Sequence, residues 1–401
     1  MANNLSIVCT GYGIKAANTS NIDSFLYNLQ KGICCLEVIE GVGPNNESNI
    51  LGLINDELEE CEKDKKLKRL PRVTKLGIIA AKEAIQSAQI NIKVKKVGLF
   101  FGLSLGNIGD ETFQKAAEHI LADEYRKIPV TLNHIVNYHS ITAQIGAELG
   151  VNGVTRSIST GCTSSLEAIE EAMIYLESGK IDVAIVGGTD SPISRGVTYG
   201  FARTRVMPFD QPLEQGAVPF QEDSKGFAMS EGSGVIILER KEDAEKRGAN
   251  IHGEIVNIVS NNDGIYIFSL DEDGEKLKEA LAEVTKDRNP DYISSQALGI
   301  PINDQIEKRC SAELFNHKIP YTSIKSMYGQ PFGAVGIFQV IAALLSVEYN
   351  FIPPTIRTTK KGYEEMNIVT ETQYKEINEV AITNHGFGGN NCCAYIQKYK
   401  A

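Results

Sequence analysis

Cys162 is the residue whose type and setting suggest chemistry most directly. It follows Gly161 and precedes three small hydroxyl residues in the segment ISTGCTSSLEAI at 158–169. The segment predicts a turn that opens a helix, where free N–H groups and the positive end of the helix dipole favour a thiolate over a thiol. Small neighbours also let an acyl group and a backbone N–H approach the sulfur, as an oxyanion hole requires. The alternative interpretation is a buried cysteine at a tight turn.

The remaining cysteines do not suggest a second reactive centre. Their spacing is sparse and irregular for a disulfide framework in a chain of 401 residues, and no CxxC pair indicates zinc. We therefore expect no metal site and interpret these cysteines as small buried side chains. The eight cysteines are Cys9, Cys34, Cys35, Cys61, Cys162, Cys310, Cys392 and Cys393.

The elements that must position Cys162 alternate between strands and helices. Short apolar runs at 97–102, 183–188 and 234–239 are typical of strands buried on both faces, because their apolar residues are consecutive. Helical periodicity lies between such runs, for example at 74–88. This alternation indicates a layered α/β fold.

Two segments look like distant copies of one unit. Residues 157–176 and 323–345 each run from a β-like stretch through a glycine turn into an amphipathic helix, which places Cys162 and Gln330 directly after their glycines. Strand, glycine and helix recur in any α/β protein, so the pattern alone leaves duplication and coincidence equally open. A duplication would divide the chain into two halves, 1–250 and 251–401.

Charge and hydropathy exclude several classes of function. The formal net charge is −11 at pH 7, so the overall field of the molecule repels nucleic acid and anionic membranes. The N-terminal residues MANNLSIVCTGYGI have no cationic segment followed by a long apolar stretch, and we expect no run of about 18 apolar residues later in the chain. The expectation is a soluble, cytoplasmic protein with no nucleic-acid or membrane partner.

The segment around Cys162 resembles the nucleophile motif of the β-ketoacyl-[acyl-carrier-protein] synthases, members of the thiolase superfamily. Further matches follow in the family order: TGYGI at 10–14, VAIVGGTDSPIS at 183–194, PFQEDSKGFAMSEGSGVIILE at 219–239, IPPT at 352–355 and GFGGNN at 386–391. This resemblance implies the thiolase fold, in which duplicated αβαβα halves form a five-layered core and chains pair as dimers. It also implies substrates carried as thioesters on the phosphopantetheine arm of an acyl carrier protein, with no bound cofactor.

The sequence departs from this family at its two catalytic histidines, which stabilise the enolate and the oxyanion during decarboxylative condensation. The family motif HGTxTPxxD corresponds to QALGIPIND, which places Gln296 at the first histidine. The motif KSxxGH corresponds to KSMYGQ, which retains Lys325 and places Gln330 at the second. Glutamine donates an N–H, but it neither carries the charge of imidazolium nor exchanges protons near neutral pH. We therefore expect decarboxylative condensation to be severely impaired.

Apolar and neutral replacements accompany the loss of the histidines. Leu298 and Ile300 stand where two threonines hydrogen-bond the pantetheine arm in the family, so we expect apolar contacts in this part of the substrate pocket. Gln339 stands where many condensing members carry a glutamate. Together these features resemble the chain-length factor, or ketosynthase β, branch of type II polyketide synthases, whose members pair with an active ketosynthase. Cys162 does not fit that branch, whose best-known members replace the cysteine.

A histidine next to the GFGG segment suggests another polar group near the pocket. His385 takes the place of a phenylalanine that is usual in a loop approaching the active site of the family. Two interpretations remain open: a polar loop residue bonded to backbone, or a relocated base that contacts Cys162. The resemblance also implies that Phe387 and Gly388 line or gate the substrate pocket.

Basic side chains are candidates for docking an acidic carrier protein. Related synthases present positive charge in the region of KDKKLKR at 63–69, and a second contact zone is expected near 203–205. Such runs are commonly only solvated surface, and in a chain-length factor the partner synthase would present much of this site. The candidate docking residues are Lys63, Lys65, Lys66, Lys68, Arg69, Arg203 and Arg205.

Two functional hypotheses follow from these features. In the first, the chain is a chain-length-factor-like subunit that pairs, as a heterodimer, with an active ketosynthase in polyketide or fatty-acyl chain assembly. In the second, the chain is a homodimer in which Cys162 accepts an acyl group and passes it to an amine, alcohol or thiol, or to a pre-formed carbon nucleophile, without decarboxylation. An ordinary elongation synthase is disfavoured, because its chemistry requires the missing histidines.

Overall fold

A ten-stranded sheet forms the centre of the molecule, whose computed structural model describes residues 5–56, 58–267 and 269–400. The strands lie in the order β11-β10-β14-β15-β9-β1-β8-β6-β4-β5. Their bounds are β1 (Ile7–Ala16), β4 (Val97–Gly102), β5 (Thr155–Ile158), β6 (Val183–Asp190), β8 (Gly232–Arg240), β9 (Gly253–Asn262), β10 (Tyr292–Ser294), β11 (Tyr321–Thr322), β14 (Glu379–His385) and β15 (Asn390–Gln397).

The two halves of this sheet repeat one topology. From the outer edge inward, the N-terminal half has the strand order β5-β4-β6-β8-β1, and the C-terminal half has the order β11-β10-β14-β15-β9. In both halves the third strand along the chain lies at the edge, followed by the second, fourth, fifth and first. Counted from that edge, the first two pairings are parallel and the last two are antiparallel. The halves join where Ile7, Val8 and Cys9 of β1 pair with the start of β9. The duplication is thereby confirmed. The boundary near residue 250 stays a prediction, because the sheet runs continuously across it.

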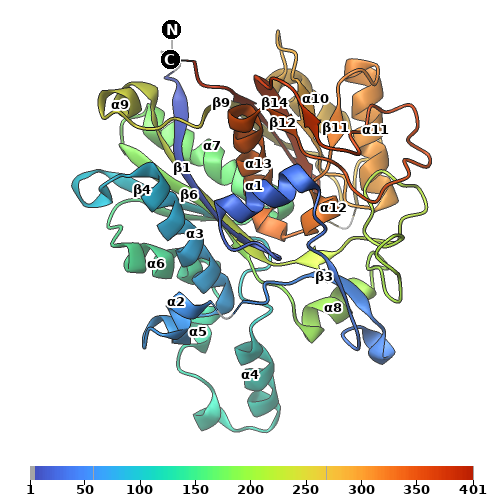
Figure 1. The fold of residues 1–401 in the computed structure, drawn as a ribbon. Helices are drawn as coiled ribbons and strands as arrows, with labels where there is room; N and C mark the ends of the chain where they lie inside the picture. The colour runs from blue at the N-terminus through green and yellow to red at the C-terminus, as the bar shows by residue number, and fades with distance from the viewer. Residues whose placement is uncertain (1–4, 57, 268, 401) are drawn as a thin grey trace.

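Helices cover both outer faces and fill the space between the halves (Figure 1). Helices α3 (Arg72–Ala88) and α6 (Tyr138–Leu149) pack on the N-terminal half, and α10 (Glu275–Val284) and α11 (Pro301–Phe315) pack on the C-terminal half. Helices α7 (Ser164–Glu177) and α13 (Val335–Tyr349) contact each other and strands of both halves. The five layers expected from the sequence are therefore present.

Consecutive apolar residues in the strands serve two different cores. In β6, Ala184 and Val186 belong to the central core around α7 and α13. Val183 and Ile185 point to the other face and belong to the core beneath α3. A strand between two helical layers needs apolar side chains on both faces, which explains why the sequence at 183–188 does not alternate with polar residues.

Helix α13 is buried on all sides, unlike the amphipathic helix that we expected. The 18 residues Phe332–Tyr349 have a mean hydropathy of 1.7, enough by length and composition to cross a membrane, so the expectation of no such run was wrong. In the structure 89 % of this segment is buried inside the protein. A helix enclosed by two sheet halves is apolar all round for the same reason as a membrane helix.

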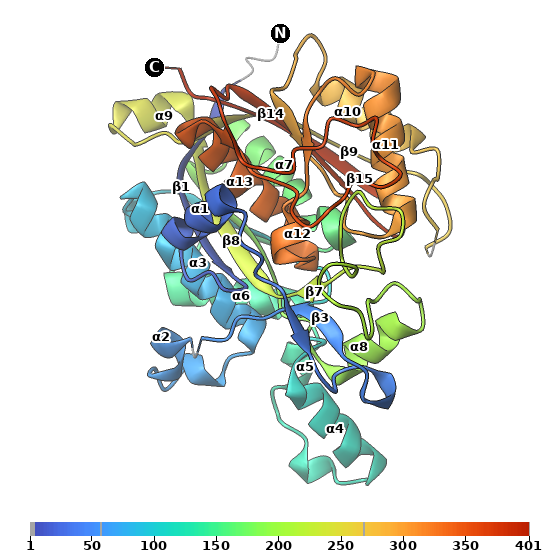
Figure 2. The ribbon, with the colours of Figure 1, turned by 45° about the vertical axis from the view of Figure 1, so that its right-hand side comes forward.

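One segment projects from the layered body (Figure 2). We call residues 106–138 the arm, because they leave the body after β4 and return at the start of α6. The arm carries α4 (Glu111–Leu121) and α5 (Leu132–Ile135). The remaining elements are α1 (Ile22–Lys31), β2 (Glu37–Ile39), β3 (Asn49–Gly52), α2 (Glu59–Glu62), α8 (Arg195–Ala202), β7 (Met229–Ser230), α9 (Lys241–Lys246), α12 (Lys325–Tyr328), β12 (Phe351–Ile352) and β13 (Gln373–Tyr374).

Candidate active site

Cys162 lies where the central helix α7 begins. It belongs to a 3₁₀ turn, Gly161–Thr163, that connects β5 to α7. Gly161 has a φ of 78°, a conformation that residues with a side chain rarely adopt. Ser164 holds the turn, because its hydroxyl lies 2.6 Å from the Gly161 carbonyl and 3.0 Å from the Leu103 carbonyl. The structure thus has the turn and helix that the sequence predicts.

Gln330 is the side chain that reaches the thiol. Its Nε2 donates to Cys162 Sγ at 3.1 Å, although the two residues are 168 positions apart. The backbone of Gln330 is fixed on both sides, because its N–H donates to Ala228 O at 2.8 Å and its carbonyl accepts from Ser230 N at 3.1 Å. Gln330 precedes α13 as Cys162 precedes α7, so the equivalent positions of the two halves meet at the sulfur.

The electrostatic setting of the thiol differs from our expectation. Burial raises the pKa of Cys162 from its ordinary value of 9.0 to about 11. The Gln330 N–H and the charge of Lys325 lower this pKa, and the charge of Asp190 raises it further. The predicted thiolate is therefore wrong for neutral pH, because the loss of water outweighs the local donors.

Lys325 is buried near the thiol. Its Nζ donates to Ser295 O at 2.9 Å, and burial lowers the pKa of its amine to about 7, against the charges of Glu307 and Cys162, which favour the protonated form. An amine with this pKa exchanges protons near neutral pH. Lys325 thus combines a position near the thiol with a pKa at which an amine exchanges protons.

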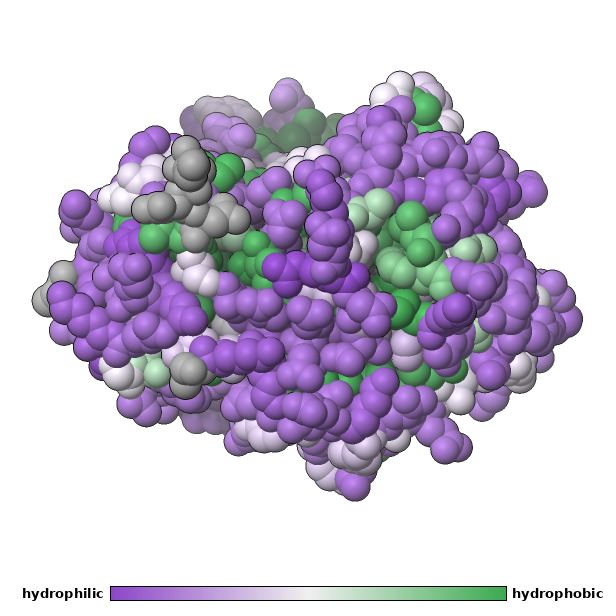
Figure 3. Space-filling view, turned by 90° about the horizontal axis from the view of Figure 1, so that it is seen from above, coloured by the Kyte–Doolittle hydropathy of each residue, from purple (hydrophilic) through white to green (hydrophobic). Residues whose placement is uncertain are grey.

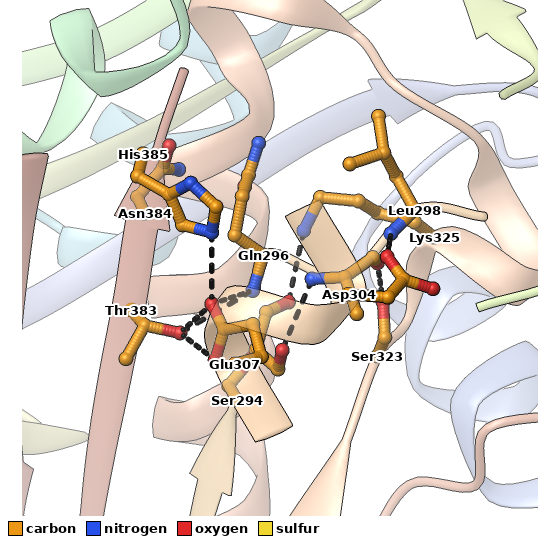
Figure 4. A network of polar contacts seen from close by, with 12 residues as sticks. Ser294, Gln296, Leu298, Asp304, Glu307, Ser323, Lys325, Thr383, Asn384 and His385 are labelled. Carbon is orange, nitrogen blue, oxygen red and sulfur yellow. Dashed lines mark hydrogen bonds and ion pairs between the residues drawn. The ribbon is translucent and has the colours of Figure 1, made fainter. Parts of the chain in front are cut away.

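Gln296 belongs to a polar network around Glu307 (Figure 4). Its backbone N–H lies 3.2 Å from Glu307 Oε1 and 3.3 Å from Thr383 Oγ1. The side chain extends away from Glu307 (Figure 4), and its buried amide oxygen has no hydrogen-bond partner among the described residues. The structure therefore joins Gln330 to the thiol, and it joins the backbone of Gln296 to the Glu307 network.

His385 joins the same network beside Glu307. Its Nε2 lies 3.3 Å from Glu307 Oε1, and both side chains are buried. Burial alone would raise the pKa of Glu307, but the imidazole, together with the Thr383 hydroxyl at 2.7 Å, lowers it below its ordinary value. The neighbouring Gly386 faces the thiol, since a Cβ added there would lie 3.4 Å from Cys162 Sγ. This geometry favours a polar packing role for His385 over a relocated base, with a carboxylate rather than backbone as its partner.

Gln339 connects strands β10 and β14 in the same region through hydrogen bonds of its side chain. Its Nε2 lies 3.0 Å from Ser294 O, 3.2 Å from Ser295 O and 3.2 Å from Thr383 O, and its Oε1 accepts from Asn384 Nδ2 at 3.0 Å. A glutamate has no N–H to donate to these carbonyls. The glutamine therefore connects α13 to β14 and to the end of β10 without a buried charge.

Three buried acidic residues that organise the site were not expected from the sequence: Glu307, Asp304 and Asp190. Asp304 Oδ1 accepts from Leu298 N at 2.9 Å and Oδ2 accepts from Phe220 N at 2.7 Å, while burial raises its pKa to about 7. It stands at the aspartate of HGTxTPxxD, so the motif contained the signal. Glu307 and Asp190 are recognisable only from their partners in the folded chain.

The residues expected to line or gate the pocket lie in two settings. Leu298 and Ile300 are buried in an apolar cluster with Phe227 and Phe332. Phe387 is 46 % exposed, and Gly388 has a φ of 92°, with Ile267 4.0 Å from where a Cβ would stand. The apolar contacts of Leu298 and Ile300 agree with the expectation from the sequence. Gating of the pocket by Phe387 and Gly388 stays a prediction.

The candidate docking residues are all exposed but do not form one surface. The run 63–69 follows α2, whereas Arg203 and Arg205 follow α8, and α2 and α8 lie on different sides of the body in both ribbon views (Figures 1 and 2). Seen from above, the molecule is mostly hydrophilic with small, interrupted apolar areas (Figure 3). Carrier-protein docking at either place stays a prediction.

We expect His385→Phe to destabilise the protein by about 1.5–3 kcal/mol at pH 7.5, because the buried Glu307 charge loses the imidazole and keeps only its other partners, such as the Thr383 hydroxyl. The pKa of Glu307 is lowered in the folded state, so its stabilising contribution is present above its unfolded pKa and is lost as pH falls. Urea unfolding of the unchanged protein and of the variant, at pH 7.5 and at pH 4.5, measures the difference in their free energies of unfolding. The loss of unfolding free energy caused by His385→Phe should be smaller at pH 4.5 than at pH 7.5, and smaller when Glu307→Gln is also present. An equal loss at both pH values would contradict the role of the Glu307 charge.

Comparison with known proteins identifies relatives along the whole chain. The model of the β-ketoacyl synthase N-terminal domain matches residues 5–244, and that of the C-terminal domain matches residues 252–359. A 3-oxoacyl-[acyl-carrier-protein] synthase 2 of Staphylococcus aureus strain MRSA252 is 28 % identical and is covered completely, as is this chain. The tetracenomycin polyketide synthase ketoacyl synthase alpha subunit of Streptomyces glaucescens is 26 % identical over 98 % of this chain and 97 % of its own.

Solved structures share the fold. One is a type II polyketide synthase acyl-carrier protein in complex with its ketosynthase bound to the hexaketide, with a TM-score of 0.89 and 20 % identity over 99 % of this chain and 100 % of the other. Another is the ishigamide ketosynthase/chain length factor, with a TM-score of 0.88 and 22 % identity over 99 % and 100 %. The thiolase fold expected from the sequence is therefore confirmed. With both domain models matched in order, the chain belongs to the β-ketoacyl synthase family.

Proposed function

We propose that the chain is a non-condensing subunit of the chain-length-factor type, which pairs with an active ketosynthase in polyketide or fatty-acyl chain assembly. The contact between Gln330 and Cys162 carries this proposal. The thiol has a pKa of about 11 and bonds to an amide, which cannot take up its proton. At Gln296, too, an amide stands where the family has an imidazole. Neither position can supply the charge that decarboxylation requires.

The arm supports a partner chain as the second component. Apolar side chains stand exposed along it, including Leu121 at 89 % and Val130 at 95 % exposure. Strand β5 lies at the end of the sheet, and an edge strand can pair with another chain. We assign the arm and the β5 edge to the contact with the partner ketosynthase. The similar ketosynthase/chain length factor supports such a pair.

The growing chain is proposed to arrive on the phosphopantetheine arm of an acyl carrier protein, with no cofactor bound by this subunit. A similar ketosynthase in complex with an acyl-carrier protein supports this partner. The exposed basic run 63–69 and Arg203 with Arg205 are the proposed docking points. Binding at these charges weakens as salt increases, because exposed charges are screened.

The proposed function is tested by Cys162→Ala in the complex with the partner ketosynthase. Product formation should stay within about twofold of the unchanged complex, because condensation occurs on the partner's cysteine. The matched control is the same substitution at the nucleophile of the partner, which should abolish product. A loss of tenfold or more in Cys162→Ala would reject the non-condensing role.

A second candidate is acyl transfer from Cys162 without decarboxylation, by a homodimer. Lys325 favours it, since an amine with a pKa of about 7 near the thiol can accept the thiol proton as an acyl group is loaded. The acyl group would then pass to an amine, alcohol or thiol, or to a pre-formed carbon nucleophile. Intact mass measurement after incubation with acyl carrier proteins would show a thioester on Cys162. Absence of loading from donors of several chain lengths would reject this candidate.

A further inference from the structure

The Asp190 carboxylate is buried at the end of β6 and binds backbone N–H groups from two distant segments. Its Oδ1 accepts from Leu105 N at 3.1 Å and Gly106 N at 2.6 Å, and its Oδ2 accepts from Ser104 N at 2.9 Å and Gly333 N at 2.7 Å. Each carboxylate oxygen thus accepts two hydrogen bonds. The carboxylate therefore connects residues 104–106 to Gly333, two segments that are far apart along the chain.

One of these segments is the root of the arm. Residues 104–106 follow β4 and lead directly into the arm, and Tyr138, where the arm returns, donates its hydroxyl to Ser104 O at 2.8 Å. A displacement of the arm therefore acts on residues whose N–H groups Asp190 holds. Burial raises the pKa of Tyr138, and the charge of the same carboxylate raises it further.

The other segment is the turn between Gln330 and α13. Phe332 in this turn has a φ of 46°, which is unusual for a residue with a side chain. Gly333 has no room for one, because an added Cβ would lie 2.8 Å from Asp190 Oδ2 and 2.7 Å from Ser104 N. Asp190 thus holds a strained turn three residues from the amide that contacts Cys162.

We propose that Asp190 is a positioning residue that couples the root of the arm to the contact between Gln330 and Cys162. A displacement of the arm then changes the reactivity of the Cys162 thiol. The consequence for a bound ketosynthase rests on the proposed function. The coupling itself belongs to the single chain and does not depend on that partner.

The test measures alkylation of Cys162 by iodoacetamide in the full chain alone, followed by peptide mass spectrometry from pH 7 to 10. In the unchanged protein the rate should rise about tenfold per pH unit without a plateau, since the thiol pKa is about 11. Asp190→Asn should move this profile to lower pH, because a negative charge near the thiol is removed. A role limited to stability would leave the position of the profile unchanged.

A double-mutant cycle tests the coupling directly. Tyr138→Phe removes the hydroxyl at the arm root, away from the thiol. In the unchanged protein this substitution should change the alkylation rate by roughly three- to tenfold. In a protein that already carries Asp190→Asn, it should cause no further change in the rate. Tyr125→Phe, on the arm but away from its root, should leave the rate unchanged. The proposal is overturned if Tyr138→Phe has no effect, or if its full effect persists in Asp190→Asn. Tyr138→Phe alone decides the matter if Asp190→Asn does not fold.

Discussion

Decarboxylation of malonyl carrier protein by the isolated chain is expected to be at least about 10⁴-fold slower than by a family member with both histidines. Removal of one preorganised donor costs about 10²–10³ in rate, and here both imidazoles are replaced by the amides of Gln296 and Gln330. Release of labelled carbon dioxide from malonyl carrier protein measures it. The second functional candidate makes the same prediction, so this experiment tests the site rather than the choice between the candidates.

The restored variant Gln296→His/Gln330→His provides the matched control. Two imidazoles should raise decarboxylation by at least about tenfold, because charge-assisted donors return to both positions. Recovery is expected to be incomplete, since Leu298 and Ile300 still lack the hydroxyls that bond the pantetheine arm in the family. Decarboxylation by the unchanged chain within about tenfold of an active relative would contradict the account of the site.

Separation of the chain from the proposed partner is the second large expected effect. Leu121→Asp/Val130→Asp places carboxylates at two exposed apolar positions of the arm, and burial of an unpaired charge in an interface is strongly unfavourable. We expect the affinity for the partner ketosynthase, or for a second copy, to fall by a factor on the order of 100 or more. Analytical ultracentrifugation of the purified chain with and without the partner measures it.

Tyr27→Asp is the matched control for the arm. Tyr27 is exposed on α1, which lies away from the arm in both ribbon views (Figures 1 and 2), so this charge should leave association unchanged. Thermal unfolding of all variants should be similar, because the substituted side chains are exposed. Unchanged association in the double variant would exclude the arm from the interface.

The layered fold was predictable because its signals are local. Strands at 97–102, 183–188 and 234–239 are apolar at consecutive positions, and the structure shows that neighbouring residues of β6 serve different cores. Helix α13 was misjudged as amphipathic, since a helix between two sheet halves has no polar face to show. Whether a helix is enclosed on one side or on all sides depends on the layers around it.

The sequence by itself determined that Cys162 opens a helix after a glycine turn and that amides stand at both histidine positions of the family motifs, because these features lie in neighbouring residues. The repeat of one unit, which the pattern left open, was decided by the matching strand order of the two halves. Tertiary structure decided how the groups behave. It half-buried the thiol, and the loss of water raised its pKa against the local signal of the helix start. It also directed His385 to Glu307 and joined Asp190 to the arm root and the Gln330 turn. Desolvation and hydrogen-bond partners come from residues far apart along the chain, so only the folded molecule settles them.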